Sequence, residues 1–149
     1  MTRVLAIFGI LLVLILGLNS HGQNPHHINP LLRTCQIVGG AGLIISLAAK
    51  NDEFVFCQFG EIAMLDGMSL ISWKSEQTSS LALAAYQKNI NANMNACYQA
   101  GGQIAPGSTV EGKRFLFCLF SDSSAIELST LSNGTSAAAN AAMNQALNL

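Results

Sequence analysis

The four cysteines are the residues of this 149-residue chain whose chemistry the sequence constrains most. They stand at Cys35, Cys57, Cys97 and Cys118. Zinc sites usually contain a close cysteine pair and thiol redox sites contain Cys-x-x-Cys, but neither spacing occurs here. Structural disulfides fit the spacing better, with free buried thiols as the alternative. Four cysteines allow three connectivities, and we predict no metal and no cofactor.

Residues that could catalyse a reaction are few. Nucleophilic catalysis needs a base beside the nucleophile, yet beyond residue 22 the only histidines are the adjacent His26 and His27. Such a pair could bind copper or nickel weakly, although we expect only a flexible polar tail. Carboxylates five residues apart could act as general acid and base, and two such pairs occur: Glu61 with Asp66, and Asp122 with Glu127. We expect solvated turn acids at these positions and predict that the protein is not an enzyme.

Composition excludes two further classes of protein. Hydrophobic residues make up 50% of the chain, charged residues make up 10%, and the formal net charge is −1. A nucleic-acid binder that neutralises phosphates needs a basic face, and a disordered tail needs low hydrophobicity with high net charge. The composition fits neither class. A surface with so few charges is also poorly protected against association, which favours a protein that works bound to a partner.

The elements that must position these residues occur twice. A Cys-x3-Gly-Gly motif begins at Cys35 and recurs 62 positions later at Cys97. A Phe-x-Phe-Cys motif ends at Cys57 and recurs 61 positions later, ending at Cys118. We interpret residues 29–73 and 91–133 as two copies of one module. Since each copy must once have closed on itself, the repeat favours the disulfides Cys35–Cys57 and Cys97–Cys118.

Each copy is predicted to begin with a helix. The first helix has Asn29 as its N-cap and Pro30 in its first turn, and the second has a longer start that Ser79 or Ser80 can cap. An apolar stripe over residues 83–97 predicts that the second helix is continuous. Glycines take the left-handed conformation without penalty, so the helices should stop at Gly39, Gly40, Gly101 and Gly102.

A β-hairpin is predicted after each helix, over residues 43–59 and 109–120. The second strands, residues 53–59 and 114–120, are apolar on nearly both faces, which is typical of a strand covered on both sides. Either the two copies bury each other or a partner covers one face. One aromatic set is therefore a candidate interaction surface: Phe54, Phe56, Phe115 and Phe117.

The sequence thus predicts an α+β fold of two tandem, disulfide-stapled helix–β-hairpin modules. Their hairpins should combine into an antiparallel sheet with helices packed on at least one face. Residues 29–73 form the first module, and residues 74–133 form a linker helix and the second module. An Ala-rich helix is predicted over residues 134–149. Its apolar stripe, which should dock on the module, is Ala139, Met143 and Leu147, and its amide stripe, expected to be solvated, is Asn140, Asn144 and Asn148.

Residues 1–22 have the layout of a secretory signal peptide. Arg3 supplies a positive charge, residues 4–18 are an uninterrupted apolar run, and small residues follow at Ser20 and Gly22. As a helix, this run would span about 22 Å, short of the roughly 30 Å hydrocarbon core of a bilayer. We expect cleavage after Gly22, which leaves residues 23–28 as an N-terminal tail, with an uncleaved N-terminal anchor as the alternative.

The motif order resembles a known family. Asn29-Pro30-x4-Cys35-x3-Gly39-Gly40, followed by an aromatic-rich strand that carries Cys57, resembles a small bacterial envelope domain of unknown function that bears a hemolysin label. In the second copy, Phe120-x-Asp122-x-Ser124-x-x-Glu127 matches part of that family's tail. The resemblance implies a secreted or periplasmic location, disulfides within each module and no known catalytic residues.

These observations favour a non-enzymatic, exported binding or scaffold protein of the bacterial envelope, acting as an accessory subunit of a larger, secretion-type assembly. Its partners would be other envelope proteins or a second copy of itself, with membrane contact only through the leader segment. The alternative is a freestanding secreted protein. It would be either a membrane-active, hemolysin-like protein or a protease inhibitor that presents a loop at residues 48–52 or 121–125.

Overall fold

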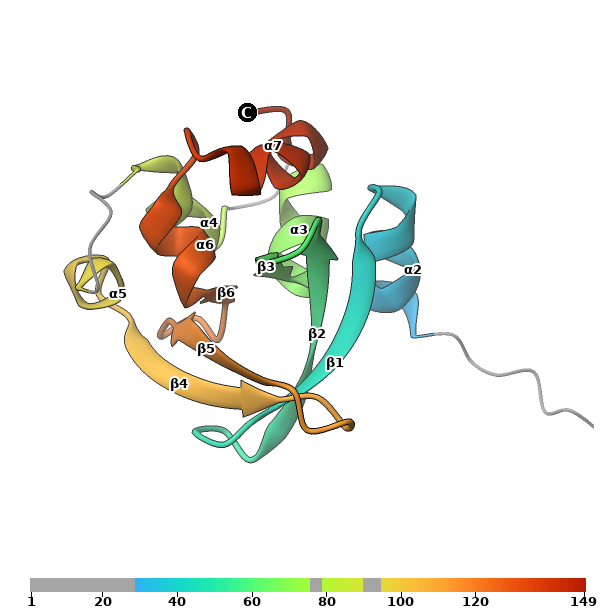
Figure 1. The fold of residues 1–149 in the computed structure, drawn as a ribbon, viewed down its shortest axis with the longest axis vertical. Helices are drawn as coiled ribbons and strands as arrows, with labels where there is room; N and C mark the ends of the chain where they lie inside the picture. Colours follow the sequence, from blue (N-terminus) through green and yellow to red (C-terminus); the bar gives the residue numbers. More distant parts are fainter. Residues whose placement is uncertain (1–28, 76–78, 90–94) are drawn as a thin grey trace, which may run out of the picture.

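The computed structural model describes residues 29–75, 79–89 and 95–149. The first half contains α2 (Pro30–Ile37), β1 (Ala41–Leu47), β2 (Asp52–Phe59), β3 (Ala63–Asp66) and α3 (Gly67–Lys74). The second half contains α4 (Leu81–Gln87), α5 (Ala96–Gln99), β4 (Gln103–Ser108), β5 (Arg114–Leu119), β6 (Ala125–Glu127) and α6 (Leu128–Asn133). A 3-10 turn, η1 (Ala138–Asn140), leads into α7 (Ala141–Leu147) (Figure 1).

The predicted signal peptide and the tail with His26 and His27 lie outside the described residues. Among the helices that are described, none is long and apolar enough to cross a membrane.

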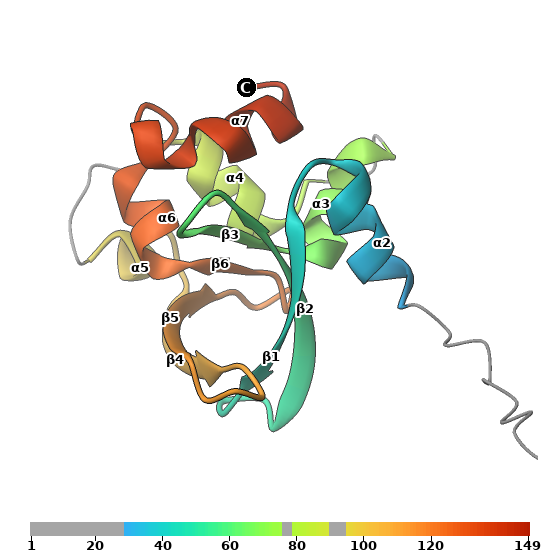
Figure 2. The same cartoon turned by 45° about the vertical axis from the view of Figure 1, so that its right-hand side comes forward.

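The strands form a closed antiparallel barrel in the order β1-β2-β3-β6-β5-β4. The predicted sheet with helices packed on a face is therefore wrong, because three strands from each half build one closed barrel that the two halves share. Figure 2 shows the helices gathered around one end of this barrel, with the β1–β2 and β4–β5 hairpin turns extending at the other. Closure of the barrel explains why the second strands are apolar on both faces. One face of each strand points into the barrel, and the other packs against the helices outside.

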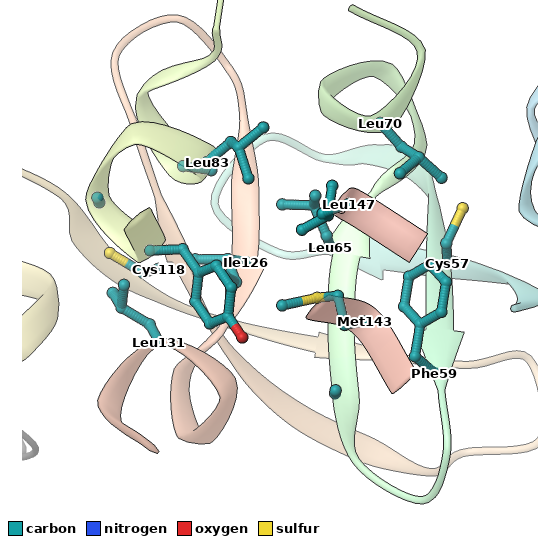
Figure 3. Close-up of a cluster of buried hydrophobic side chains, with 14 of the residues drawn as sticks. Cys57, Phe59, Leu65, Leu70, Leu83, Cys118, Ile126, Leu131, Met143 and Leu147 are labelled. Carbon is teal, nitrogen blue, oxygen red and sulfur yellow. The ribbon is translucent and has the colours of Figure 1, made fainter. Parts of the chain in front are cut away.

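Alternate residues along the strands enter two separate cores. The inner core consists of strand residues alone, among them Ile45, Phe56, Met64 and Phe117. The outer core joins the other face of the strands to the helices, and Figure 3 shows Met143 and Leu147 of α7 beside Leu65 of β3. The helices thus cover the outside of the barrel, while Phe56 and Phe117 of the second strands fill its inside.

The two halves meet at equivalent positions. The order of elements α2-β1-β2-β3-α3 in the first half recurs as α5-β4-β5-β6-α6 in the second. Between the halves, β3 pairs with β6 at Leu65↔Ile126 and β1 pairs with β4 at Ser46↔Ser108, which are positions 61 and 62 apart. The rings of Phe56 and Phe117, also 61 apart, stack with centroids 4.2 Å apart. Antiparallel pairing of equivalent residues indicates a pseudo-twofold relation between the halves.

Both predicted disulfides are confirmed: Cys35 pairs with Cys57, and Cys97 pairs with Cys118. Each joins the last turn of a helix to the second strand of the following hairpin. That turn is a Schellman motif in both halves, in which the second glycine donates its N–H to the carbonyl oxygen of the cysteine. The N···O distances are 2.8 Å for Gly40 to Cys35 and 2.9 Å for Gly102 to Cys97. The Cys-x3-Gly-Gly spacing is therefore the spacing of this helix end.

The two glycines of each pair have different roles. Gly39 and Gly101 have φ of +83° and +82°, which confirms them as helix stops. Gly40 and Gly102 do not have positive φ and are needed for space. A Cβ on Gly102 would lie 3.1 Å from the Sγ of Cys97 and closer still to the Sγ of Cys118. The expectation that all four glycines act through their backbone conformation is therefore wrong for Gly40 and Gly102.

Two helix predictions are also corrected. The helix predicted to continue through residues 83–97 ends at Gln87, because Asn89 takes a positive φ of 50° and donates its N–H to the carbonyl oxygen of Tyr86. In α7, Met143 and Leu147 dock as predicted, whereas the amide stripe is not simply solvated. Asn140 is fully buried and donates to the carbonyl oxygens of Thr130 and Gly134.

The inner core is filled asymmetrically across the pseudo-twofold relation. Ile45 on β1 corresponds to Gly107 on β4, 62 positions later. A Cβ on Gly107 would lie 2.7 Å from Ile45 Cγ2, 2.8 Å from Leu47 Cδ2 and 2.9 Å from Phe117 Cε2. A large residue in one half thus occupies the space that a glycine leaves in the other, which is how interiors reach close packing.

We expect Gly107→Ala to lower the free energy of unfolding by about 1–3 kcal/mol, because an added methyl group overpacks a filled core. Ile45→Ala alone should cost about 2–5 kcal/mol through the cavity that it leaves. Since the new methyl group enters that cavity, the double variant should lose less than the sum of the two. Urea unfolding with both disulfides intact measures all three. Strict additivity would contradict this account of the core.

Candidate functional site

A groove with a volume of about 770 Å³ lies between α6 and the outer faces of β4 and β5. Its apolar lining comprises Ala48, Pro106, Gly107, Phe115, Leu116 and Leu128. Uncharged polar side chains complete most of it: Ser46, Ser108, Ser129, Ser132 and Asn133. Small-molecule and peptide sites are typically of this size and apolar character.

Comparison of the two halves shows why this surface matters. Leu116 of β5 corresponds to Val55 of β2, and Leu128 of α6 corresponds to Gly67 of α3. In the first half, Leu31 of α2 packs here, with its Cβ 3.4 Å from the position of a Cβ on Gly67, and Val55 is only 7% exposed. In the second half, Leu116 is 48% exposed and lines the groove. The first half therefore covers this outward apolar position with its own helix α2, whereas the second half leaves it exposed in the groove.

Positive charge gathers at one side of the groove. Arg114 lines it at the start of β5, and within the described part of the chain no carboxylate forms an ion pair with this guanidinium. The Nζ of Lys113 lies 4.9 Å from the centroid of the Phe115 ring, a cation–π contact. The groove also contains one carboxylate, Glu127, whose oxygens accept hydrogen bonds from Ser129 and Thr130 at the start of α6.

Glu127 and its equivalent Asp66 are the N-caps of α6 and α3. The Glu127 carboxylate accepts from the backbone N–H of Ser129 (3.0 Å) and Thr130 (2.7 Å), and from both hydroxyls of these residues. Asp66 accepts from the N–H of Ser69 at 2.8 Å and from its hydroxyl at 2.5 Å. Capping residues satisfy N–H groups that a helix start leaves unpaired.

The same caps reach across to the other half of the barrel. Asp66 Oδ2 accepts from the N–H of Ala125 at 2.9 Å, beside the Leu65↔Ile126 pair. On the equivalent side, the N–H of Met64 donates to Thr130 Oγ1 at 3.1 Å, and this hydroxyl donates in turn to Glu127. The caps therefore extend the short β3–β6 pairing, and solvated turn acids were the wrong expectation for Asp66 and Glu127, which are buried.

Asp122 has a comparable structural role at α4. Its Oδ2 accepts from the N–H of Leu81 at 2.8 Å, and its Oδ1 accepts from the hydroxyl of Ser124 at 2.6 Å. Ser124 Oγ accepts in turn from the N–H of Ala82 at 2.9 Å. The loop at residues 121–125 is thus held against the start of a helix, whereas the other loop considered, at residues 48–52, is an exposed hairpin turn.

The surroundings of Asp66 and Asp122 shift the pKa values of these two carboxyl groups in opposite directions. Burial raises the pKa of Asp66 above its usual value, and the donors from Ser69 and Ala125 only partly counter it. For Asp122, slight burial would raise the pKa, but the hydrogen bonds from Leu81 and Ser124 outweigh it and hold the pKa below its usual value. A perturbed carboxyl is a common mark of an active site, but here the carboxyls are fully engaged in helix caps.

The chemistry that the groove can support depends on the groups in its lining. It contains hydroxyl groups, yet the described residues include no histidine that could activate them. Within these same residues there is no free cysteine and no group of three or more potential metal ligands. What the lining can supply is apolar area, uncharged hydrogen-bonding groups and the guanidinium of Arg114.

The predicted aromatic surface is placed mostly inside the molecule. Phe56 and Phe117 are fully buried in the inner core, so their assignment to an interaction surface is wrong. Phe54 and Phe115 are partly buried against the same core, and Phe115 reaches the groove. Sequence reasoning missed Arg114, Leu116 and Leu128, although the outward apolar position of Leu116 on a doubly apolar strand was a usable signal.

Comparison with family models, with curated proteins and with solved structures finds no match for this chain. The resemblance to the small envelope domain with the hemolysin label therefore stays a prediction.

We expect Asp66 and Asp122 to shape the pH dependence of stability in opposite directions. Between the usual pKa of 3.8 and its raised native pKa, Asp66 keeps its proton in the native state while the unfolded chain loses it. The contribution of Asp66 to stability therefore falls as pH rises through this range. The contribution of Asp122 is present above 3.8 and is lost as pH falls. Urea unfolding from pH 3 to 7 gives the slope of the free energy of unfolding against pH. Asp66→Asn and Asp122→Asn should therefore change this slope with opposite signs. Curves parallel to the wild type would contradict both assignments.

Proposed function

We propose that this protein is a non-enzymatic binding protein that acts outside the cytoplasm and uses the groove beside α6 as its binding site. The observation that carries the proposal is the groove itself, with an apolar floor, an uncharged polar rim and one unpaired arginine among the described residues. The acids near it support the fold and leave no general acid–base pair for chemistry.

The compartment follows from the disulfides. Two disulfides close the fold, and such bonds persist in oxidising, extracytoplasmic environments. Within that setting we propose the periplasm or cell envelope of a bacterium, reached through the signal peptide predicted in residues 1–22. Secretion into the medium is the alternative location.

The character of the surface supports a protein partner. Charged residues make up only 10% of the chain, and the apolar side chain of Leu116 stays 48% exposed in the groove. Apolar patches on a monomer often mark interaction sites. We therefore propose an accessory subunit of a larger envelope assembly of the secretion type, bound to other envelope proteins or to a second copy of itself.

Site-specific photo-crosslinking tests this function. A photoreactive phenylalanine analogue placed at Leu116 should give one defined protein adduct in intact cells that make the protein. The same analogue at Met68 of α3, which is similarly exposed but distant from the groove lining, is the matched control. Adducts of the same pattern at both positions, or none at Leu116, would contradict a protein partner in the groove. Recovery of the protein from the medium without an adduct would favour the freestanding inhibitor or membrane-active protein.

A further inference from the structure

We infer that the groove binds an extended, apolar segment of a partner protein that carries a carboxylate, and that Arg114 binds this carboxylate. The inference rests on the proposed function and specifies the chemistry of its partner. Three features of the groove lead to it, namely a free strand edge, an apolar floor with a polar rim, and an uncompensated positive charge.

The free edge belongs to the first half of β5. Strand β4 pairs with β5 from Arg114 to Leu119, whereas β6 pairs only with Phe117, Cys118 and Leu119. After Glu127 the chain turns into α6 and leaves the sheet. Among the described residues, positions 114–116 therefore have a neighbouring strand on one side only. The groove runs from the outer face of β4 across β5 to α6, so this free edge lies within it. An extended peptide can add to such an edge by main-chain hydrogen bonds.

The lining suits the side chains and amides of a peptide. Alternate side chains of an extended segment point to one face, and Leu116, Leu128 and Pro106 offer them an apolar floor. Serine and asparagine side chains on the rim can pair with peptide groups that do not reach the strand edge. A lipid chain would make no use of those polar groups, and sites for small apolar ligands normally enclose most of the ligand surface.

The positive charge of Arg114 determines which chemical group of the partner segment binds at this side of the groove. Arg114 has no ion pair among the described residues, and Lys113 lies beside it on the ring of Phe115. The carboxylate of Glu127 is held by four donors from Ser129 and Thr130 and is thereby oriented toward α6. A guanidinium binds a carboxylate through two parallel hydrogen bonds. The carboxylate could be the C-terminus of the partner or an acidic side chain within the segment.

The test is selection of a random octapeptide library, displayed with free C-termini, on the full chain with both disulfides formed. We expect enrichment of peptides with apolar residues at alternate positions and a carboxylate at one end. Arg114→Gln should lower the affinity for an enriched peptide by about 10-fold or more, since a hydrogen bond to a charged group is lost. Arg33→Gln, the same change at an exposed position of α2 outside the groove, is the matched control and should leave binding unchanged.

A second pair of variants tests the floor. Leu116→Glu should abolish binding, whereas Val110→Glu, on the exposed β4–β5 hairpin turn, should leave it intact. Amidation of the C-terminus then separates the two sources of the carboxylate, because it weakens only a peptide that binds through its terminus. The inference would be overturned if an enriched peptide bound Arg114→Gln or Leu116→Glu with the same affinity as the wild type. Failure of the library to enrich any peptide would also overturn it. A defined adduct from Leu116 in cells combined with no enrichment would leave the proposed function standing and remove only this partner chemistry.

Discussion

The structure depends on one constraint, which is that its central strands are apolar on both faces and must be covered on both. A small open sheet with helices on one face would leave the other face of β2 and β5 in water. Closing the sheet turns one face inward, where Phe56 and Phe117 stack, and leaves the other to the helices. Buried residues along a strand then alternate between an inner and an outer core, so that the same strand contributes to both.

Duplication makes this closure geometrically simple. Two copies related by a twofold axis pair equivalent strands antiparallel, as at Leu65↔Ile126 and Ser46↔Ser108. These pairings between the halves are short, and Asp66 and Thr130 reinforce one of them by accepting N–H groups from the opposite half. The buried carboxylate at position 66 is thus part of the connection between the copies, which accounts for a polar group in a core otherwise built from apolar side chains.

The sequence was informative where structure is local and uninformative where it is not. The Gly-Gly pairs predicted the helix stops, because a helix end is set within a few residues. The repeat predicted the disulfides, because each copy must close on itself. The barrel could not be predicted, because pairing of residue 65 with residue 126 leaves no trace in the pattern of either strand. The burial of Asp66 and Glu127 was missed for a similar reason, since a cap sequence looks the same whether the helix starts in solvent or in a core. The alternation along the second strand already places Leu116 on the face opposite Phe115 and Phe117, but that this position lines a groove became visible only once the strands were placed.

The difference between the halves indicates where function has developed in a duplicated fold. Residues that support the fold keep their character in both copies, as the cysteines, the caps and the stacked rings do. One of the divergent positions is apolar and covered in the first copy but exposed in the second, since Val55 lies beneath α2 whereas Leu116 lines the groove. Exposing a leucine costs folding free energy of about 1.5–3 kcal/mol relative to burying it. A partner that covers Leu116 would recover part of that free energy as binding. Under the proposed function, the same change that weakens one half of the barrel therefore contributes to its affinity for a partner.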